Sequence, residues 1–146
     1  MRVELTKRAD YAIRAVLALA RATDGELMSV RRVSDEQHIP VRFLPQVMSD
    51  LVRAGLADGV EGRRGGYRLA RPAASISLLD IIEAIEGDSR RRSCVLRGGP
   101  CAINGVCDVH EAFMSAQEAL LGRLADANVG ALADASLAGI VTADRG

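Results

Sequence analysis

Aromatic residues are scarce in this sequence: tryptophan is absent, and phenylalanine and tyrosine contribute two residues each. Because hydrophobic residues still make up 49% of the 146 positions, the core must consist mainly of alanine, leucine, valine and isoleucine. A chain of this length and composition is expected to be an assembly of packed helices, one ordinary domain with an appendage. No run of 18 uncharged apolar residues is present, so we expect no membrane-spanning segment.

The sequence also lacks a net charge and an apolar leader. The opening residues, 1–6, do not have the apolar stretch of a signal peptide, and we therefore expect a cytoplasmic protein. The formal net charge is zero, but residues 29–71 contain eight arginines against five acidic residues. This local excess is compatible with nucleic-acid binding, and an ordinary solvated surface explains it equally well.

Cysteine is rare, and all three cysteines lie close together. They are Cys94, Cys101 and Cys107. An odd number cannot pair completely within one chain, and a reducing cytosol disfavours structural disulfides. The cluster therefore indicates metal ligation or redox chemistry.

Apolar residues recur at helical spacing in several segments. The first predicted helix runs from about Lys7 to Ala22 with Thr6 as its N-cap, and the second runs from a Ser29 cap to about His38. A break at Ile39-Pro40 precedes a third helix that ends before Gly55. Further helices are predicted over 78–86, opened by a capping box at Ser77, and over about 109–127.

Between the third and fourth helices the apolar period changes from 3.6 to 2. Residues 56–60 and 66–70 are predicted strands, and the glycine-rich segment 61–65 joins them as a hairpin. A helix–turn–helix followed by a basic hairpin is the pattern of a winged helix. The expected fold is therefore mainly α, with a small β wing.

The start of the third helix carries side chains suited to reading DNA. Arg42 and Gln46 lie four residues apart on the side opposite the apolar stripe, and the N-terminal end of such a helix enters the major groove. Arginine can bind guanine with two hydrogen bonds, and glutamine can do the same with adenine. Arg31, in the preceding helix, is a further candidate contact. The alternative is a surface helix with ordinary polar residues.

Two arginines, Arg63 and Arg64, stand between glycines at the tip of the predicted hairpin. Such side chains suit contacts to phosphates or to a narrow minor groove. A solvated tight turn would explain them equally well.

Thiolates in a glycine-bearing loop can hold an iron–sulfur cluster, whose irons take cysteine and occasionally histidine ligands. Asp108 and His110 lie beside the last cysteine. The spacing is unlike the paired Cys-x2-Cys of common zinc ribbons, although a zinc site with three cysteines and one histidine stays possible on these residues. Three inert thiols are the remaining alternative.

Taken together, these motifs resemble the Rrf2 family of bacterial winged-helix regulators. The resemblance covers the chain to about residue 127 and includes the cysteine loop. The stretches that carry it are Leu5-Thr6-Lys7 with Asp10-Tyr11-Ala12, Ile39-Pro40 with Phe43-Leu44, Gly65-Gly66-Tyr67 with Leu69-Ala70, and Ile76-Ser77-Leu78 with Asp80-Ile81-Ile82.

The resemblance implies a homodimer on a palindromic operator, with a two-iron or four-iron cluster held by the three cysteines. The fourth ligand differs among family members. Asp10 occupies the place of an acid supplied by the partner subunit, and His110 occupies the place of a local histidine; we favour Asp10. An acid at that position could equally be a surface residue that stabilises the start of its helix.

The sequence departs from the family pattern at two places. Six residues rather than five separate the first two cysteines, which leaves the cluster type open. Pro45 stands where the family often has a polar, base-contacting residue, which leaves the operator sequence open. We retain Pro45 as a candidate contact to DNA.

The sequence thus predicts a winged-helix DNA-binding domain at 1–87, a cysteine-rich sensor loop at 88–108, and a dimerisation helix with a C-terminal tail at 109–146. We expect a dimeric, non-enzymatic transcriptional repressor whose operator affinity depends on an iron–sulfur cluster that senses nitric oxide, redox state or iron–sulfur status. The alternatives are a regulator that switches through bare thiols, an iron–sulfur carrier, and a winged helix that binds only proteins.

Overall fold

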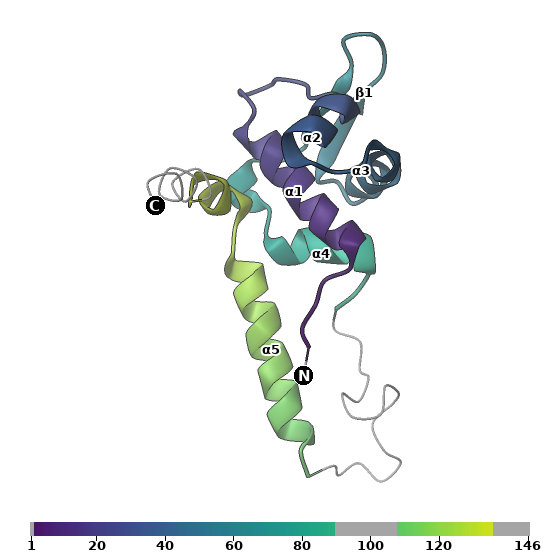
Figure 1. Ribbon diagram of the computed structural model, residues 1–146. Coiled ribbons are helices and arrows are strands. Elements are labelled where there is room, and N and C mark those ends of the chain that lie inside the picture. Colours follow the sequence, from purple (N-terminus) through teal and green to yellow (C-terminus); the bar gives the residue numbers. More distant parts are fainter. Residues whose placement is uncertain (1, 90–107, 136–146) are drawn as a thin grey trace, which may run out of the picture.

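The computed structural model describes residues 2–89 and 108–135 (Figure 1). Helices and one antiparallel hairpin make up these residues, as predicted. In chain order the elements are α1 (Lys7–Arg21), α2 (Val30–Gln37), the 3-10 helix η1 (Val41–Phe43), α3 (Leu44–Arg53), β1 (Ala57–Val60), β2 (Gly66–Leu69), the 3-10 helix η2 (Ala73–Ser75), α4 (Leu78–Glu86) and α5 (His110–Asp126). Within the described residues, no helix is long and apolar enough to cross a membrane.

The predicted caps are present at the starts of three helices. The side chain of Thr6 accepts a hydrogen bond from the amide of Ala9 at the start of α1, and the side chain of Ser29 caps α2. At α4 the capping box is complete, since Ser77 Oγ accepts from the Asp80 amide at 3.0 Å and Asp80 Oδ2 accepts from the Ser77 amide at 2.9 Å. These bonds satisfy amides that have no partner inside the helix.

The connection between α2 and α3 differs from the prediction in one respect. Instead of one helix from Pro40 onward, the chain forms the short η1 and then begins α3 at Leu44. The reason is Pro45, which has no N–H to donate to the carbonyl of Val41 and is tolerated only in a first helical turn. The interruption leaves Arg42 in η1 and Gln46 in α3.

The hairpin pairs β1 with β2 in antiparallel register, Ala57 opposite Leu69 and Val60 opposite Gly66. Met28 extends the pairing, because it exchanges backbone hydrogen bonds with Tyr67 at 2.9 and 2.8 Å. The tight tip requires glycine at position 65, where a Cβ atom would lie 2.1 Å from the carbonyl oxygen of Val60. Met28 therefore joins β2 near the tip-side end of the hairpin, where Gly65 permits the tight turn.

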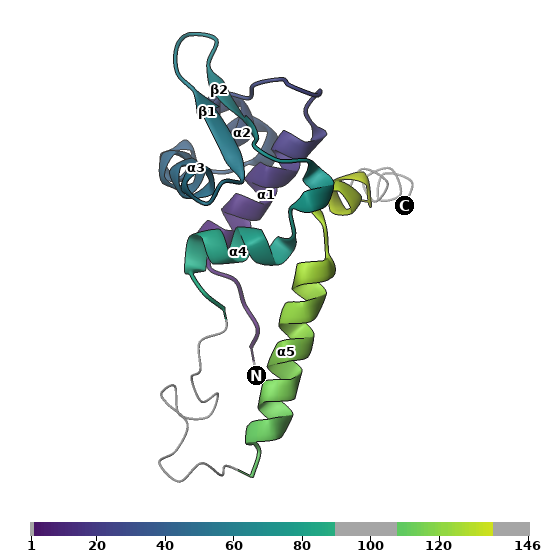
Figure 2. The same ribbon diagram turned by 180° about the vertical axis from the view of Figure 1, so that it is seen from behind.

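The core is aliphatic, as the composition predicts, and α1 crosses its centre between α4 and the helix–turn–helix (Figures 1 and 2). Its fully buried side chains come from all parts of the winged helix and include Val16, Met28, Val33, Ile39, Leu44, Met48, Leu51, Ile76 and Ile81. One pair of aromatic rings, Tyr11 and Phe43, packs at a centroid distance of 5.3 Å and joins α1 to η1.

Helix α5 is different, because none of its residues is buried and it extends away from the winged helix (Figure 1). After α5 the chain returns to the domain. The amide of Leu78 donates to the carbonyl of Ala127 at 2.9 Å, and the amide of Val129 donates to that of Ile76 at 2.8 Å. Residues 129–135 are helical, and Val129 is fully buried in the common core.

Candidate nucleic-acid interface and metal-ligating residues

The two predicted base-reading side chains lie at neighbouring exposed positions. Arg42 is exposed in η1, where its guanidinium carbon lies 4.8 Å from the centroid of the Phe43 ring. Gln46 is exposed in the first turn of α3, while Leu44 and Val47 beside it are buried in the core. The apolar face of α3 thus holds the helix against the domain, and its polar face is open to a partner.

Gln46 belongs to a polar cluster that the sequence did not reveal. Its Nε2 donates to Oδ1 of Asp50 at 3.0 Å. Arg8 from α1 binds the other carboxylate oxygen, Oδ2, and Arg53 Nη2 lies 3.1 Å from Oδ1. Asp50 is 6% exposed and is the one buried charged residue in the part of the chain that the structure describes. The sequence signal for this cluster is an acidic residue one turn after Gln46, on the side of the helix that otherwise carries apolar core residues.

The remaining predicted DNA contacts are also exposed. Arg31 lies on α2, Pro45 at the start of α3, and Arg63 and Arg64 at the wing tip. Among the described residues, no ion pair engages any of these three arginines. The wing and α3 occupy the half of the molecule away from α5 (Figure 2).

Two other arginines, Arg32 and Arg71, form ion pairs with acidic side chains. Arg32 pairs with Glu36 at 2.8 Å and with Glu26, and the hydrogen bond from Arg32 lowers the pKa of Glu26. Arg71 pairs with Asp80 at 3.4 Å. Among the described residues, Arg32 and Arg71 are thus held in ion pairs, whereas Arg31, Arg63 and Arg64 are not.

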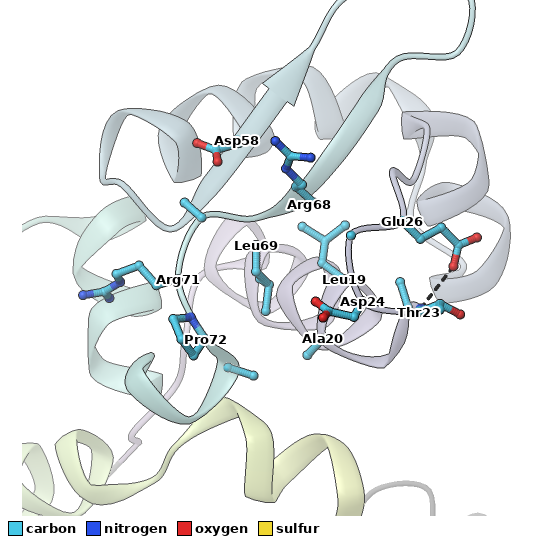
Figure 3. A pocket seen from close by; sticks show the side chains of 14 residues that line it. Leu19, Ala20, Thr23, Asp24, Glu26, Asp58, Arg68, Leu69, Arg71 and Pro72 are labelled. Carbon is cyan, nitrogen blue, oxygen red and sulfur yellow. Dashed lines mark hydrogen bonds between the residues drawn. The ribbon is translucent and has the colours of Figure 1, made fainter.

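An open cleft lies between the turn after α1 and the segment after β2 (Figure 3). Leu19, Leu69 and Pro72 contribute apolar surface to it, and charged side chains such as Glu26 and Arg71 stand at its edge. None of the predicted site residues lines this cleft, so it is separate from the candidate interface.

Asp10 lies in the first turn of α1 and its side chain is 54% exposed. It accepts a hydrogen bond from Arg14 Nη2 at 2.9 Å, and Arg14 Nη1 donates to the carbonyl of Gln37 at 2.7 Å. Gln37 is the last residue of α2. Asp10 is thus connected through one side chain to the end of the second helix.

His110 is exposed and begins α5. Cys94, Cys101 and Cys107 lie outside the described residues, so their arrangement around a metal stays a prediction. Among the described residues, no group of three or more metal-ligating side chains comes together. Asp10 and His110 belong to separate helices, and α5 begins at the end of the molecule away from the winged helix (Figure 1).

Comparison with known proteins identifies relatives over most of the chain. Residues 5–135 match the family described as "Rrf2: Iron-dependent Transcriptional regulator". The "HTH-type transcriptional regulator IscR" of Cereibacter sphaeroides is 44% identical over 86 residues, 58% of this chain and 56% of that protein. The IscR of Klebsiella pneumoniae is 30% identical over 130 residues, 89% of this chain and 79% of that protein. The chain thus aligns with little more than half of the first relative's length and with most of the second's.

Solved structures show the same fold. CymR, described as the global cysteine regulator of B. subtilis, matches with a TM-score of 0.77 at 21% identity, over 91% of this chain and 98% of CymR. The T. potens IscR matches with a TM-score of 0.73 at 22% identity, over 91% of this chain and 88% of that protein. The winged-helix prediction is confirmed, and the matching family consists of transcriptional regulators rather than enzymes.

Proposed function

The chain belongs to the Rrf2 family of transcriptional regulators, and we propose that it binds a palindromic operator as a homodimer and represses transcription there. The observation that carries this proposal is the exposed pair formed by Arg42 in η1 and Gln46 at the start of α3, together with the wing-tip residues Arg63 and Arg64. The helix reads bases from the major groove, and the wing contacts phosphates or the minor groove. Two copies would address half-sites spaced by one helical turn, roughly 34–36 Å.

The ion-pair pattern provides a direct test with matched controls. Arg31 and Arg32 are neighbours on α2, but only Arg32 is held by acids. Binding to a selected duplex is measured over a range of salt concentrations. Arg31→Ala should weaken all sequences alike and reduce the salt slope by about one unit, whereas Arg32→Ala should leave that slope unchanged.

The wing allows the same comparison. Arg63→Ala and Arg64→Ala should reduce the salt slope, and Arg71→Ala, which removes an arginine already paired with Asp80, should not. A parent protein whose affinity for duplex DNA is low and independent of salt would refute DNA binding. That result would favour a winged helix that binds only proteins.

The proposed dimer interface is α5. The helix has no buried residue within its own chain, and Leu120 on it is 42% exposed. Isolated helices have little stability in water, so a long helix with little tertiary cover favours an external partner. A second copy supplies an identical apolar stripe by symmetry.

For the sensor, we propose that Cys94, Cys101 and Cys107 hold an iron–sulfur cluster. Three thiolates with a carboxylate or an imidazole form a donor set that suits such a cluster. Asp10 and His110 are both exposed and could therefore be reached by a group carried on the cysteine segment. When bound, the cluster would supply a redox-active centre that reacts with oxygen or nitric oxide.

The contacts of Asp10 indicate how its use as the fourth ligand could be coupled to DNA binding. A metal-bound Asp10 carboxylate would compete with Arg14, which also holds the last carbonyl of α2. Releasing or retaining that guanidinium would shift α2 relative to α1. Since α2 supports α3, a ligand supplied across the dimer would change the placement of both reading helices.

The sensor is tested by anaerobic reconstitution with iron and sulfide, followed by visible absorption and duplex binding. Cys101→Ala should lose the charge-transfer bands, and Asp10→Ala should alter them and change DNA affinity. His110→Ala tests the alternative fourth ligand. Glu111→Ala, at the adjacent exposed position of α5, is its control.

Three results would contradict the sensor proposal. An absence of visible bands with DNA affinity that responds to thiol reductants would indicate a bare-thiol switch. Transfer of the cluster to an acceptor, without sequence-specific DNA binding, would indicate a carrier. Equal operator binding by the parent, Cys101→Ala and Asp10→Ala, with and without iron and sulfide, would assign the cysteines another role.

A further inference from the structure

We infer that Asp50 is a positioning residue that sets the base preference of Gln46 and makes it select adenine. The inference rests on the proposed reading of DNA by α3. It starts from the one buried carboxylate of the described chain, which contacts an exposed side chain at the front of the reading helix. Asp50 itself is buried and does not reach the groove, so its effect must pass through Gln46.

Two arginines hold the carboxylate in place. Arg8 reaches it from α1, and Arg53 reaches it from the next turn of α3. Both arginines only donate, and an ionised carboxylate only accepts. The cluster therefore presents oxygen, and never a hydrogen, toward Gln46.

This polarity decides which way the Gln46 amide faces. A side-chain amide has two N–H donors on one side and a carbonyl acceptor on the other. Because Asp50 Oδ1 accepts from Gln46 Nε2 at 3.0 Å, the nitrogen must turn toward α3 and one of its hydrogens is used. Gln46 keeps one free N–H and its carbonyl oxygen for a partner.

One donor beside one acceptor is the complement of adenine in the major groove. Adenine offers N7 as an acceptor and its N6 amino group as a donor, whereas guanine offers two acceptors, N7 and O6. Gln46 could satisfy guanine only by presenting both N–H groups, and the second is already bound to Asp50. Asp50 therefore favours adenine over guanine at the base pair that Gln46 contacts.

The experiment selects duplexes from a random-sequence pool with the full-length protein and then compares single base-pair changes. Gln46→Met, at an exposed position and of similar length, identifies the base pair whose preference depends on Gln46. The parent should prefer adenine to guanine there by roughly 5- to 150-fold, the range of one bidentate contact. Asp50→Asn should remove or invert this preference, because Arg8 holds the amide oxygen at the position of Oδ2 and the new amino group then takes the position of Oδ1, which faces Gln46.

Two controls separate positioning from a structural role. Arg53→Gln removes a partner of the same carboxylate from an exposed position and should keep the adenine preference. In the Gln46→Met background, Asp50→Asn should have no further effect on that base pair. A structural role would instead weaken all sequences alike and persist in both backgrounds.

The outcomes are distinct. Selection of no sequence by the parent would refute the proposed regulator and this inference with it. Sequence-specific binding with guanine or a pyrimidine preferred at the Gln46-dependent position would overturn this inference alone. If Asp50→Asn does not fold, the base preferred at the Gln46-dependent position still tests the inference. Adenine at that position in the parent, together with no base preference there in Gln46→Met, supports it.

Discussion

Helices α1 and α5 have similar lengths but opposite environments. Helix α1 buries residues along most of its length, from Ala9 to Leu19, whereas α5 buries none. The first is covered by α2, α3, α4 and β2, and the second touches the domain mainly beside α4. The winged helix therefore buries its apolar residues within one chain, whereas α5 leaves all of its residues exposed or half-buried.

This contrast indicates that the winged helix and α5 are stabilised in different ways. In the winged helix, apolar burial and capped helix ends act within the monomer. In α5, the apolar side chains gain little until another surface covers them. Stability of α5 should consequently depend on protein concentration, and stability of the winged helix should not.

Leucine-to-alanine substitutions in the winged helix and in α5 should show the largest difference between the two regions. Leu44 is fully buried, and Leu44→Ala should lower the free energy of unfolding by about 2–5 kcal/mol at every protein concentration. Leu120→Ala should have an effect that grows as the protein is concentrated into the dimer range. Urea unfolding at two concentrations measures both, and equal concentration dependence of the two variants would break the comparison.

A charge in place of the exposed Leu120 should disrupt the proposed dimer. Leu120→Glu buries an unpaired carboxylate in the proposed interface, which should weaken association by about 2 kcal/mol or more and yield a monomer at micromolar concentration by light scattering. Ser115→Glu is the control, because it lies about 140° around the helix from Leu120. A Leu120→Glu variant that stays dimeric would show that α5 is not the interface.

Serine-to-alanine changes test the helix ends with a smaller expected effect. Ser77→Ala removes the capping box of α4 and should cost about 1 kcal/mol in thermal or urea unfolding. Ser115→Ala, at an exposed position inside α5, should change stability by less than about 0.5 kcal/mol. Similar losses for both variants would mean that the cap contributes nothing specific.

The smallest effect is expected on the surface of the winged helix. Hydrogen bonding to Arg32 lowers the pKa of Glu26 below its ordinary value of 4.5. Its contribution to stability is therefore present above that value and is lost as the pH falls through the lower, folded-state pKa. Glu26→Gln should be slightly less stable than the parent at pH 7, and the difference should disappear in strong acid.

Urea midpoints across this pH range measure the effect. In an Arg32→Gln background the pH-dependent difference should be smaller, because the hydrogen bond from Arg32 is gone and only the contacts with Thr23 still lower the pKa of Glu26. An undiminished difference in that background would assign it to another cause.

Local rules in the sequence determined the elements and their ends. Thr6, Ser29 and Ser77 cap helices because a hydroxyl beside free amides is a local signal, and Gly65 is demanded by the hairpin itself. The aliphatic stripes specified which faces turn inward. The exposure of Gln46 on the polar face of α3 followed from the same periodicity, whereas the place of Arg42 in the separate η1 did not.

Only the tertiary structure decided which polar side chains are partners. Arg8 and Asp50 are 42 residues apart in the sequence, and no local pattern encodes a pairing between two such distant residues. The same holds for the return of residues 127–129 to the start of α4, which the sequence presented only as a tail. Helical periodicity in the sequence indicates which side chains of a segment face the core and which face water. The partners of polar side chains depend instead on how the helices pack against one another, and that arrangement exists only once the core has formed.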